Sequence, residues 1–151
     1  MKLTDLVPPE LIELHLQGTT KADVLQELVR VLDKSGDLND AEGCLQALHE
    51  REAIGSTGIG FGVAIPHGKT DAVKTPRVAF GMHKSGVDWH SLDGLPANLV
   101  FLIAVPETAT DREHLKIIQT LSRTVIREDF RSALLQASSK QDVLNLLGTI
   151  E

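Results

Sequence analysis

One stretch of the chain, residues 55–69, limits the folds that this sequence can adopt. It reads GSTGIGFGVAIPHGK, with four glycines in eight residues, then Val63-Ala64-Ile65, then Pro66-His67-Gly68. The apolar run is typical of a buried strand, and Pro66 should end that strand because proline cannot donate to the ladder. His67 would then be fixed at a strand end, with a flexible glycine, Gly68, behind it.

His67 has two interpretations at this point. Imidazole is a good nucleophile near neutral pH, so a histidine held there is suited to group transfer. It could equally be a hydrogen-bonded turn residue. The glycines favour transfer, because their backbone allows close approach and can present N–H groups to an anion.

Two nucleotide-binding motifs do not fit this stretch. The dinucleotide fingerprint G-x-G-x-x-G fails because Val63 and Ile65 occupy the positions that require its third glycine. The P-loop ending Gly68-Lys69-Thr70 fails because Gly62 is one residue out of place.

Length and composition indicate one domain over residues 1–151, with an apolar fraction of 42% that is sufficient for a core. The net charge of −6 argues against a general nucleic-acid or anionic-membrane surface. The longest apolar run, Leu99–Val105, is too short to span a bilayer. The N-terminus has no apolar core of the kind a signal peptide needs, because Asp5 and Pro8-Pro9 interrupt it. The single Cys44 excludes an internal disulfide and suits a reducing cytoplasm, where we expect the protein.

Hydrophobic periodicity predicts the first half of the fold. We expect a strand over Leu11–Leu16, a helix capped by Thr20 that ends near Ser35, and a helix capped by Asn39 that ends near Glu52. Strands should follow at Val63–Ile65, Arg77–Met82 and Leu99–Val105. The last is apolar on both faces and is therefore expected at the centre of the sheet.

Three helices are predicted in the second half. Thr110 and Glu113 form a capping box that opens the longest one, and further helices lie around Phe130–Leu135 and from the cap Ser139 to Leu147. The core-facing stripe of the longest helix is expected to comprise His114, Leu115, Ile118, Leu121 and Val125. The order β-α-α-β-β-β-α-α-α allows both faces of a sheet to be covered, which defines an α/β fold.

Three segments, GSTGIGFGVAIPHGK, SLDGLPANLVFLIAVPE and DREHLKIIQTL, carry a resemblance that covers nearly the whole chain. They resemble the enzyme IIA domain of the fructose/mannitol and nitrogen-regulatory (type 2) branch of the bacterial phosphotransferase system. The resemblance implies a three-layer α/β/α sandwich around a mixed sheet. It also implies that His67 carries a phosphoryl group between two partner proteins, with no metal or cofactor, because the energy arrives in the donor's phosphohistidine.

His114 and Arg51 are the candidates for supporting that transfer. His114 could be a satisfied core histidine, but the capping box places it near a helix N-terminus, where an anion is favoured. Arg51 could complement the dipole of its helix or pair with Glu50 or Glu52 on the surface. The resemblance maps the family's second histidine onto His114, and it implies that Arg51 stabilises the phosphoryl group through its fork of donors.

Other residues of the stretch are weaker candidates. Ser56, Thr57 and Gly68 could support phosphoryl binding, although Ser56 and Thr57 are as well explained as loop hydrogen-bonding residues. Ile59 and Phe61 could belong to a partner surface or to the core.

Two other kinds of site are disfavoured. A zinc site built from His67, His83, His90 and His114 lacks the tight spacing of known sites. A hydrolase using Ser56 or Ser91 lacks the G-x-S-x-G elbow, and Cys44 reads as a small apolar filler.

The preferred hypothesis is a cytoplasmic IIA phosphocarrier for a fructose-like sugar. It would take the phosphoryl group from the small histidine-containing phosphocarrier protein onto His67 and pass it to a cysteine of a IIB component. The alternative is a nitrogen-type regulator in which the state of His67 controls binding to other proteins. A domain related to anion transporters is a third hypothesis, which the PHGK segment and the lack of a membrane segment disfavour.

Overall fold

The computed structural model describes residues 2–150 and contains one mixed β-sheet. Its strands are β1 (Ile12–Glu13), β2 (Gly58–Gly60), β3 (Val63–Ala64), β4 (His67–Lys69), β5 (Arg77–Val87) and β6 (Ala97–Val105). The order is β1-β5-β6-β3-β2, with β4 also paired to β6. β6 therefore lies at the centre of the sheet, antiparallel to β5 and parallel to β3 and β4, as its apolar composition predicts.

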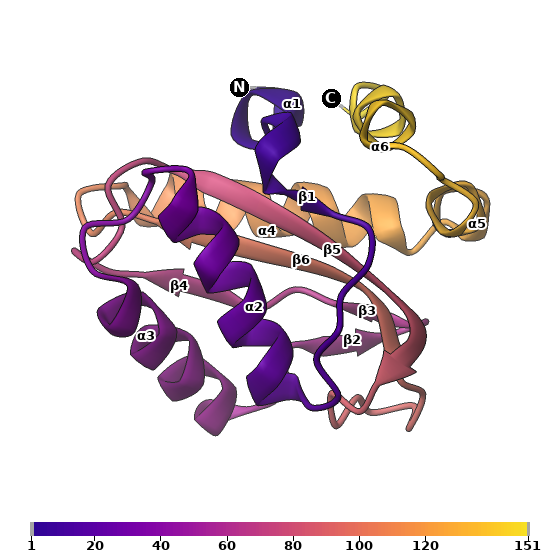
Figure 1. The fold of residues 1–151 in the computed structure, drawn as a ribbon, viewed down its shortest axis with the longest axis horizontal. Coiled ribbons are helices and arrows are strands. Elements are labelled where there is room, and N and C mark those ends of the chain that lie inside the picture. Colours follow the sequence, from indigo (N-terminus) through magenta and orange to yellow (C-terminus); the bar gives the residue numbers. More distant parts are fainter. Residues whose placement is uncertain (1, 151) are drawn as a thin grey trace.

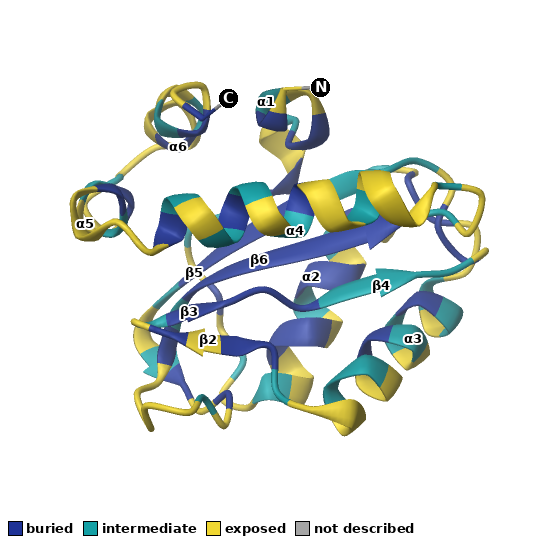
Figure 2. Cartoon of the chain, turned by 180° about the vertical axis from the view of Figure 1, so that it is seen from behind, coloured by how far each residue is buried: buried dark blue, intermediate teal, exposed yellow. Residues whose placement is uncertain are grey.

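Helices cover both faces of this sheet. They are α1 (Leu3–Leu6), α2 (Lys21–Lys34), α3 (Ala41–Ile54), α4 (Asp111–Val125), α5 (Glu128–Leu135) and α6 (Lys140–Leu147). α2 and α3 lie on one face and α4 on the other, with α1, α5 and α6 beyond α4 along the same side (Figures 1 and 2). Leu25, Leu28 and Trp89 belong to one core cluster, and Phe101, Ile117 and Leu121 to the other. This confirms the three-layer α/β/α sandwich.

The helix starts follow from local capping. The hydroxyls of Thr20, Thr110 and Ser139 each accept a hydrogen bond from the backbone N–H three residues on, as their spacing predicts. α3 begins after Asp40 rather than Asn39. The Asn39 side chain instead donates to the carbonyl of Asp71 at 3.0 Å, which removes it from the helix start.

Three predicted elements need correction. The expected strand 11–16 is only Ile12–Glu13, because a 3₁₀ turn follows Pro8 over Pro9–Leu11 and the Glu13 carboxylate then takes the N–H of His15. β5 continues beyond the predicted end at Met82 to Val87, and its register with β6 shifts between these two residues. On α4, Leu115 is 53% exposed and Ile117 is buried in the stripe instead.

The glycine-rich stretch differs most from the prediction. Pro66 interrupts the strand rather than ending it, because β3 and β4 pair with the same strand in one continuous register, Ala64 with Val100 and His67 with Ile103. His67 therefore begins a strand. Gly68 is not a flexible residue behind it, since it is paired with Ala104 within β4.

Candidate functional site

The fold brings His67, His114 and Arg51 together from three separate elements. His67 begins β4, His114 lies in the first turn of α4, and Arg51 lies in the last turn of α3. The two imidazole rings meet edge to face, with centroids 5.6 Å apart. Arg51 Nε lies 3.1 Å from His67 Nε2. The three side chains are thus close enough to act on one small group.

Hydrogen bonds assign the protonation state of the His67 ring. Nδ1 lies 2.9 Å from the carbonyl oxygen of Ile65, which can only accept, so Nδ1 carries the hydrogen. Nε2 accepts from Arg51 Nε–H and therefore carries the lone pair. Burial is the largest cause and lowers the pKa of His67. The hydrogen bond to the Ile65 carbonyl opposes it, the Arg51 charge lowers the pKa further, and Glu52 raises it by the smallest amount. The ring is neutral near pH 7, with its lone pair on Nε2.

His114 contributes an unsatisfied nitrogen to the site. Its Nε2 is the one buried side-chain nitrogen or oxygen without a hydrogen-bond partner among residues 2–150. Burial lowers the pKa of His114, and the neighbouring His67 and Lys69 lower it further. Buried polar atoms in proteins are almost always paired. A purely structural core histidine would have a partner here, so the unpaired nitrogen points to a ligand or a transient group.

Lys69 belongs to the same cluster, and it was not among the site residues predicted from the sequence. A Cβ on Gly68 would face Leu48 of α3, so the residues on either side of Gly68, His67 and Lys69, point toward α4. Lys69 Nζ donates to Asp111, the first residue of α4, at 2.8 Å. The alternation of side chains along a strand is the signal that places Lys69 beside His67.

Ser56 and Thr57 use their hydroxyls within the loop. Ser56 Oγ donates to the carbonyl of Trp89, and Thr57 Oγ1 donates to Glu52 while accepting from Trp89 Nε1 at 3.0 Å. These bonds shape the loop beside Arg51. A direct contact of Ser56, Thr57 or Gly68 with a phosphoryl group stays a prediction, and the hydroxyl bonds of the first two do not favour it.

Glu52 is a buried carboxylate that sequence reasoning treats as part of a surface run. Its side chain is 7% exposed and pairs with Lys21 Nζ at 3.1 Å. It also accepts from the N–H of Thr57 at 3.1 Å. The partner Lys21 lies 31 residues away in the sequence, so no local pattern could have revealed the pair.

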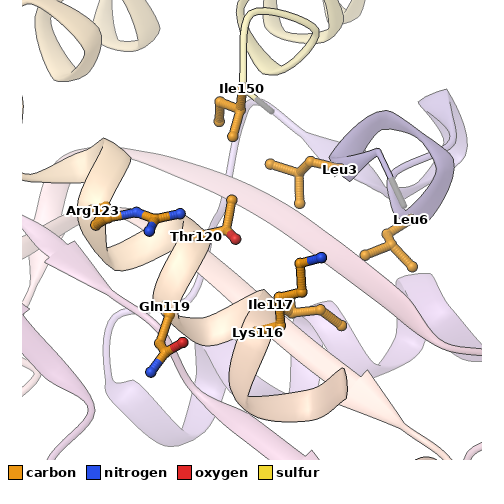
Figure 3. Close-up of a pocket in the computed structure, with 8 residues that line it drawn as sticks. All are labelled: Leu3, Leu6, Lys116, Ile117, Gln119, Thr120, Arg123 and Ile150. Carbon is orange, nitrogen blue, oxygen red and sulfur yellow. The ribbon is translucent and has the colours of Figure 1, made fainter. Parts of the chain in front are cut away.

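The remaining histidines and cavities lie apart from this cluster. His83 contacts Gly18 through Nε2, and His90 faces Asp88. Among residues 2–150, no group of three histidine, cysteine or acidic side chains has the geometry of a metal site. A hollow of about 340 Å³ opens between α1 and α4 (Figure 3), and it shares no lining residue with the histidine pair. Across the same described residues, no helix is long and apolar enough to cross a membrane.

Exposed apolar side chains lie on the β2–β3 hairpin. Ile59 and Phe61 are 38% and 55% exposed, so neither is a core residue. Phe61 has a positive φ of 59°, and the Arg131 guanidinium lies 4.9 Å from its ring centroid. Of the two predicted alternatives for Ile59 and Phe61, a partner surface or the core, the exposure excludes the core.

Comparison with known proteins identifies the family of the chain. The family model for the phosphoenolpyruvate-dependent sugar phosphotransferase system, EIIA 2, matches residues 5–149. The chain is 42% identical to the fructose-specific EIIA component of the phosphotransferase system from Haloferax volcanii, and the match covers 99% of each. It is 45% identical to the fructose-specific EIIABC component of Bacillus subtilis over 97% of its own length, but it spans only 23% of that relative.

Solved structures show the same fold. Nitrogen regulatory protein IIA-Ntr from Neisseria meningitidis superposes with a TM-score of 0.88 at 33% identity, covering 95% of this chain and 97% of that one. The IIA-mannitol enzyme from Escherichia coli, solved in complex with phosphorylated IIB-mannitol, has a TM-score of 0.79 at 28% identity, covering 93% and 95%. The chain belongs to the type 2 EIIA family of the phosphoenolpyruvate-dependent sugar phosphotransferase system.

Proposed function

We propose that this protein is a phosphocarrier that accepts a phosphoryl group on Nε2 of His67. The observation that carries the proposal is the hydrogen-bond pattern of the ring. The Ile65 carbonyl holds the proton on Nδ1, so the free lone pair is on Nε2, the atom that faces Arg51. A neutral, oriented imidazole is the nucleophile that phosphoryl transfer needs.

The transfer step exchanges one nitrogen–phosphorus bond for another. His67 Nε2 attacks the phosphorus of a phosphohistidine on the donor, the donor's N–P bond breaks, and its electron pair returns to the donor's imidazole. Before this attack the Arg51 Nε–H hydrogen bond leaves Nε2, which frees its lone pair, and moves to a phosphoryl oxygen. No oxidant or nucleotide enters, because the donor already carries the phosphoryl group.

Three groups of this cluster support stabilisation of the transferred charge. Arg51 supplies a charged donor, and His114 Nε2 is unpaired. Lys69 adds a second positive charge near the N-terminus of α4. Phosphoryl transfer is catalysed mainly by positioning and by such electrostatic stabilisation. The arrangement suits a carrier that must accept and release the group reversibly.

Membership of this family supports a particular donor and acceptor. We propose that the small histidine-containing phosphocarrier protein is the donor and that a cysteine of a IIB component is the acceptor, in the cytoplasm. The fructose-specific relative, matched over 99% of both chains, supports a fructose-like sugar. The Escherichia coli mannitol complex supports a IIB partner of this type.

A regulatory role is the second candidate. The likeness to IIA-Ntr of Neisseria meningitidis, at a TM-score of 0.88, favours it. Phosphorylation would then act by adding negative charge to the surface around His67, which excludes or recruits a target. The two roles differ in whether the phosphoryl group leaves His67 quickly.

Labelling experiments test both steps. Phosphoenolpyruvate and the upstream proteins should place an acid-labile phosphoryl group on the wild-type chain, mapped to His67, and none on His67→Ala. Retained labelling of that variant would refute the site. With cognate IIB and IIC components and a fructose-type sugar, label should reach the sugar as fast as it arrives on His67. Slow transfer together with target binding that depends on His67 would favour the regulator.

A further inference from the structure

We propose that Glu52 is a positioning residue for this site: its buried carboxylate, paired with Lys21, fixes the loop that holds Arg51 against His67. The inference rests on the proposed phosphocarrier function. It assigns a task to a carboxylate that neither touches His67 nor faces solvent.

Glu52 receives three donors from two separate parts of the fold. Oε1 accepts from Lys21 Nζ and from the backbone N–H of Thr57, both at 3.1 Å. Oε2 accepts from the Thr57 hydroxyl. A buried carboxylate must be paired in this way to keep its charge. Glu52 therefore ties the end of α3 to the loop and, through Lys21, to the start of α2.

The same loop determines where Arg51 points. Arg51 Nη1 donates to the carbonyl of Gly55 at 2.8 Å, while its Nε donates to His67. Gly55 also closes α3 through its N–H, which donates to the carbonyl of Glu52 at 3.2 Å. Gly55 lies two residues before Thr57, which the Glu52 carboxylate holds by both backbone and hydroxyl. Removing that carboxylate releases the loop, and the Gly55 carbonyl no longer fixes the guanidinium.

Trp89 makes this network observable. Its indole N–H donates to Thr57 Oγ1 at 3.0 Å, and Lys21 Nζ lies 5.7 Å from the ring centroid. It is fully buried, and it is the only tryptophan of a chain that has no tyrosine. Its fluorescence therefore comes from one buried residue, whose indole N–H is bonded to Thr57 of the Glu52 network. We expect its emission to change when Glu52 is altered.

The central experiment combines Glu52→Gln with Arg51→Gln. Glu52→Gln keeps the shape and a carbonyl acceptor but loses the charge that orders Lys21 and Thr57. We expect it to slow phosphorylation of His67 by roughly tenfold to a hundredfold, because displacements near 1 Å at a reacting group have such effects. If Glu52 acts through Arg51, the double variant should be no slower than Arg51→Gln alone. Rate losses that multiply would overturn the proposal.

A direct readout does not depend on phosphoryl transfer. Nitrogen-15 NMR of the unphosphorylated protein should show the Arg51 Nε–H bond to His67 Nε2 in the wild type and its loss in Glu52→Gln. Glu50→Gln is the matched control, because Glu50 is an exposed neighbour bonded only to Gln46. It should keep the bond, the rate and the Trp89 emission. A Glu52→Gln spectrum with the Arg51–His67 bond intact would refute the positioning role.

A second variant and a wild-type control complete the experiment. If Glu52→Gln does not fold, Thr57→Val removes the hydroxyl link instead, and the loss of the Arg51–His67 bond is again expected. Its persistence in that folded variant would count against the proposal. Failure of the wild-type chain to accept a phosphoryl group would refute the proposed function, whereas the NMR comparison tests the Glu52 link independently.

Discussion

Substitution of Arg51 by glutamine is the sharpest test of how the site works. Among the residues that the structure describes, Arg51 is the only one that hydrogen-bonds to Nε2 of His67, the proposed nucleophile, at 3.1 Å. The change removes a charged donor while retaining a polar side chain. It leaves the Ile65 carbonyl, which holds the proton on Nδ1, in place.

The expected magnitude follows from two effects of the guanidinium. Loss of one preorganised donor to the developing phosphoryl charge costs about a hundredfold in rate, which corresponds to ~2.7 kcal/mol of transition-state free energy. Arg51 also lowers the pKa of His67. Its removal should raise that pKa, so that more of the ring is protonated and unable to attack at a given pH below neutrality.

Rapid-quench measurement of transfer from the phosphorylated donor, across pH 5–8, separates these effects. The variant should be slower at every pH, and the pH of its half-maximal rate should move upward. Arg123→Gln is a matched control, because Arg123 is an exposed arginine of α4 that lines the hollow in Figure 3, away from His67. A variant rate within threefold of wild type would show that Arg51 only caps its helix.

Three other outcomes are expected. His114→Ala should slow transfer by roughly tenfold to a hundredfold in the same assay, because it removes a donor. The label should stay on His67, since the nucleophile is unchanged. An unchanged rate would show that His114 has only a structural role. The free energy of unfolding should fall as the pH drops below the ordinary histidine value of 6.5, because the pKa values of His67 and His114 are lowered in the folded state and the unfolded chain is protonated first. Denaturant titrations of a variant that carries both His67→Gln and His114→Gln should show a flatter dependence of this free energy on pH. Leu121→Ala should destabilise the fold by about 2–5 kcal/mol, as expected for a fully buried leucine, and a smaller loss in thermal unfolding would contradict the core assignment.

Features that depend on neighbouring residues were predictable from the sequence. The capping box of Thr110 and Glu113 needs only four residues, and it placed His114 in the first turn of α4. The fully apolar β6 likewise indicated its own central position. The contact between Arg51 and His67 was expected only through the family resemblance, since its residues lie in different layers of the fold.

The short strands and the buried acid were not predictable in this way. β2 consists of Gly58-Ile59-Gly60, which has no strand-like composition, and it forms because it pairs with β3. β4 has only three residues and is stabilised by pairing with β6. The sequence around Glu52 predicts a surface residue, because its partner Lys21 is brought to it only by the fold. In each case the deciding partner is distant in the sequence, so local propensity carries little information.

The geometry of the site also explains why it needs so few residues. A carrier must hold the phosphoryl group long enough to meet its next partner, yet it must not bind the group so tightly that release becomes slow. Arg51 and Lys69 already have partners, His67 Nε2 and Asp111, so each exchanges an existing bond for one to phosphate rather than gaining a new one. His114 Nε2 alone enters unpaired. Net stabilisation of the phosphorylated state is then modest, because hydrogen bonds made by exchange contribute little free energy. On the proposed function, that balance is what lets His67 pass the group on.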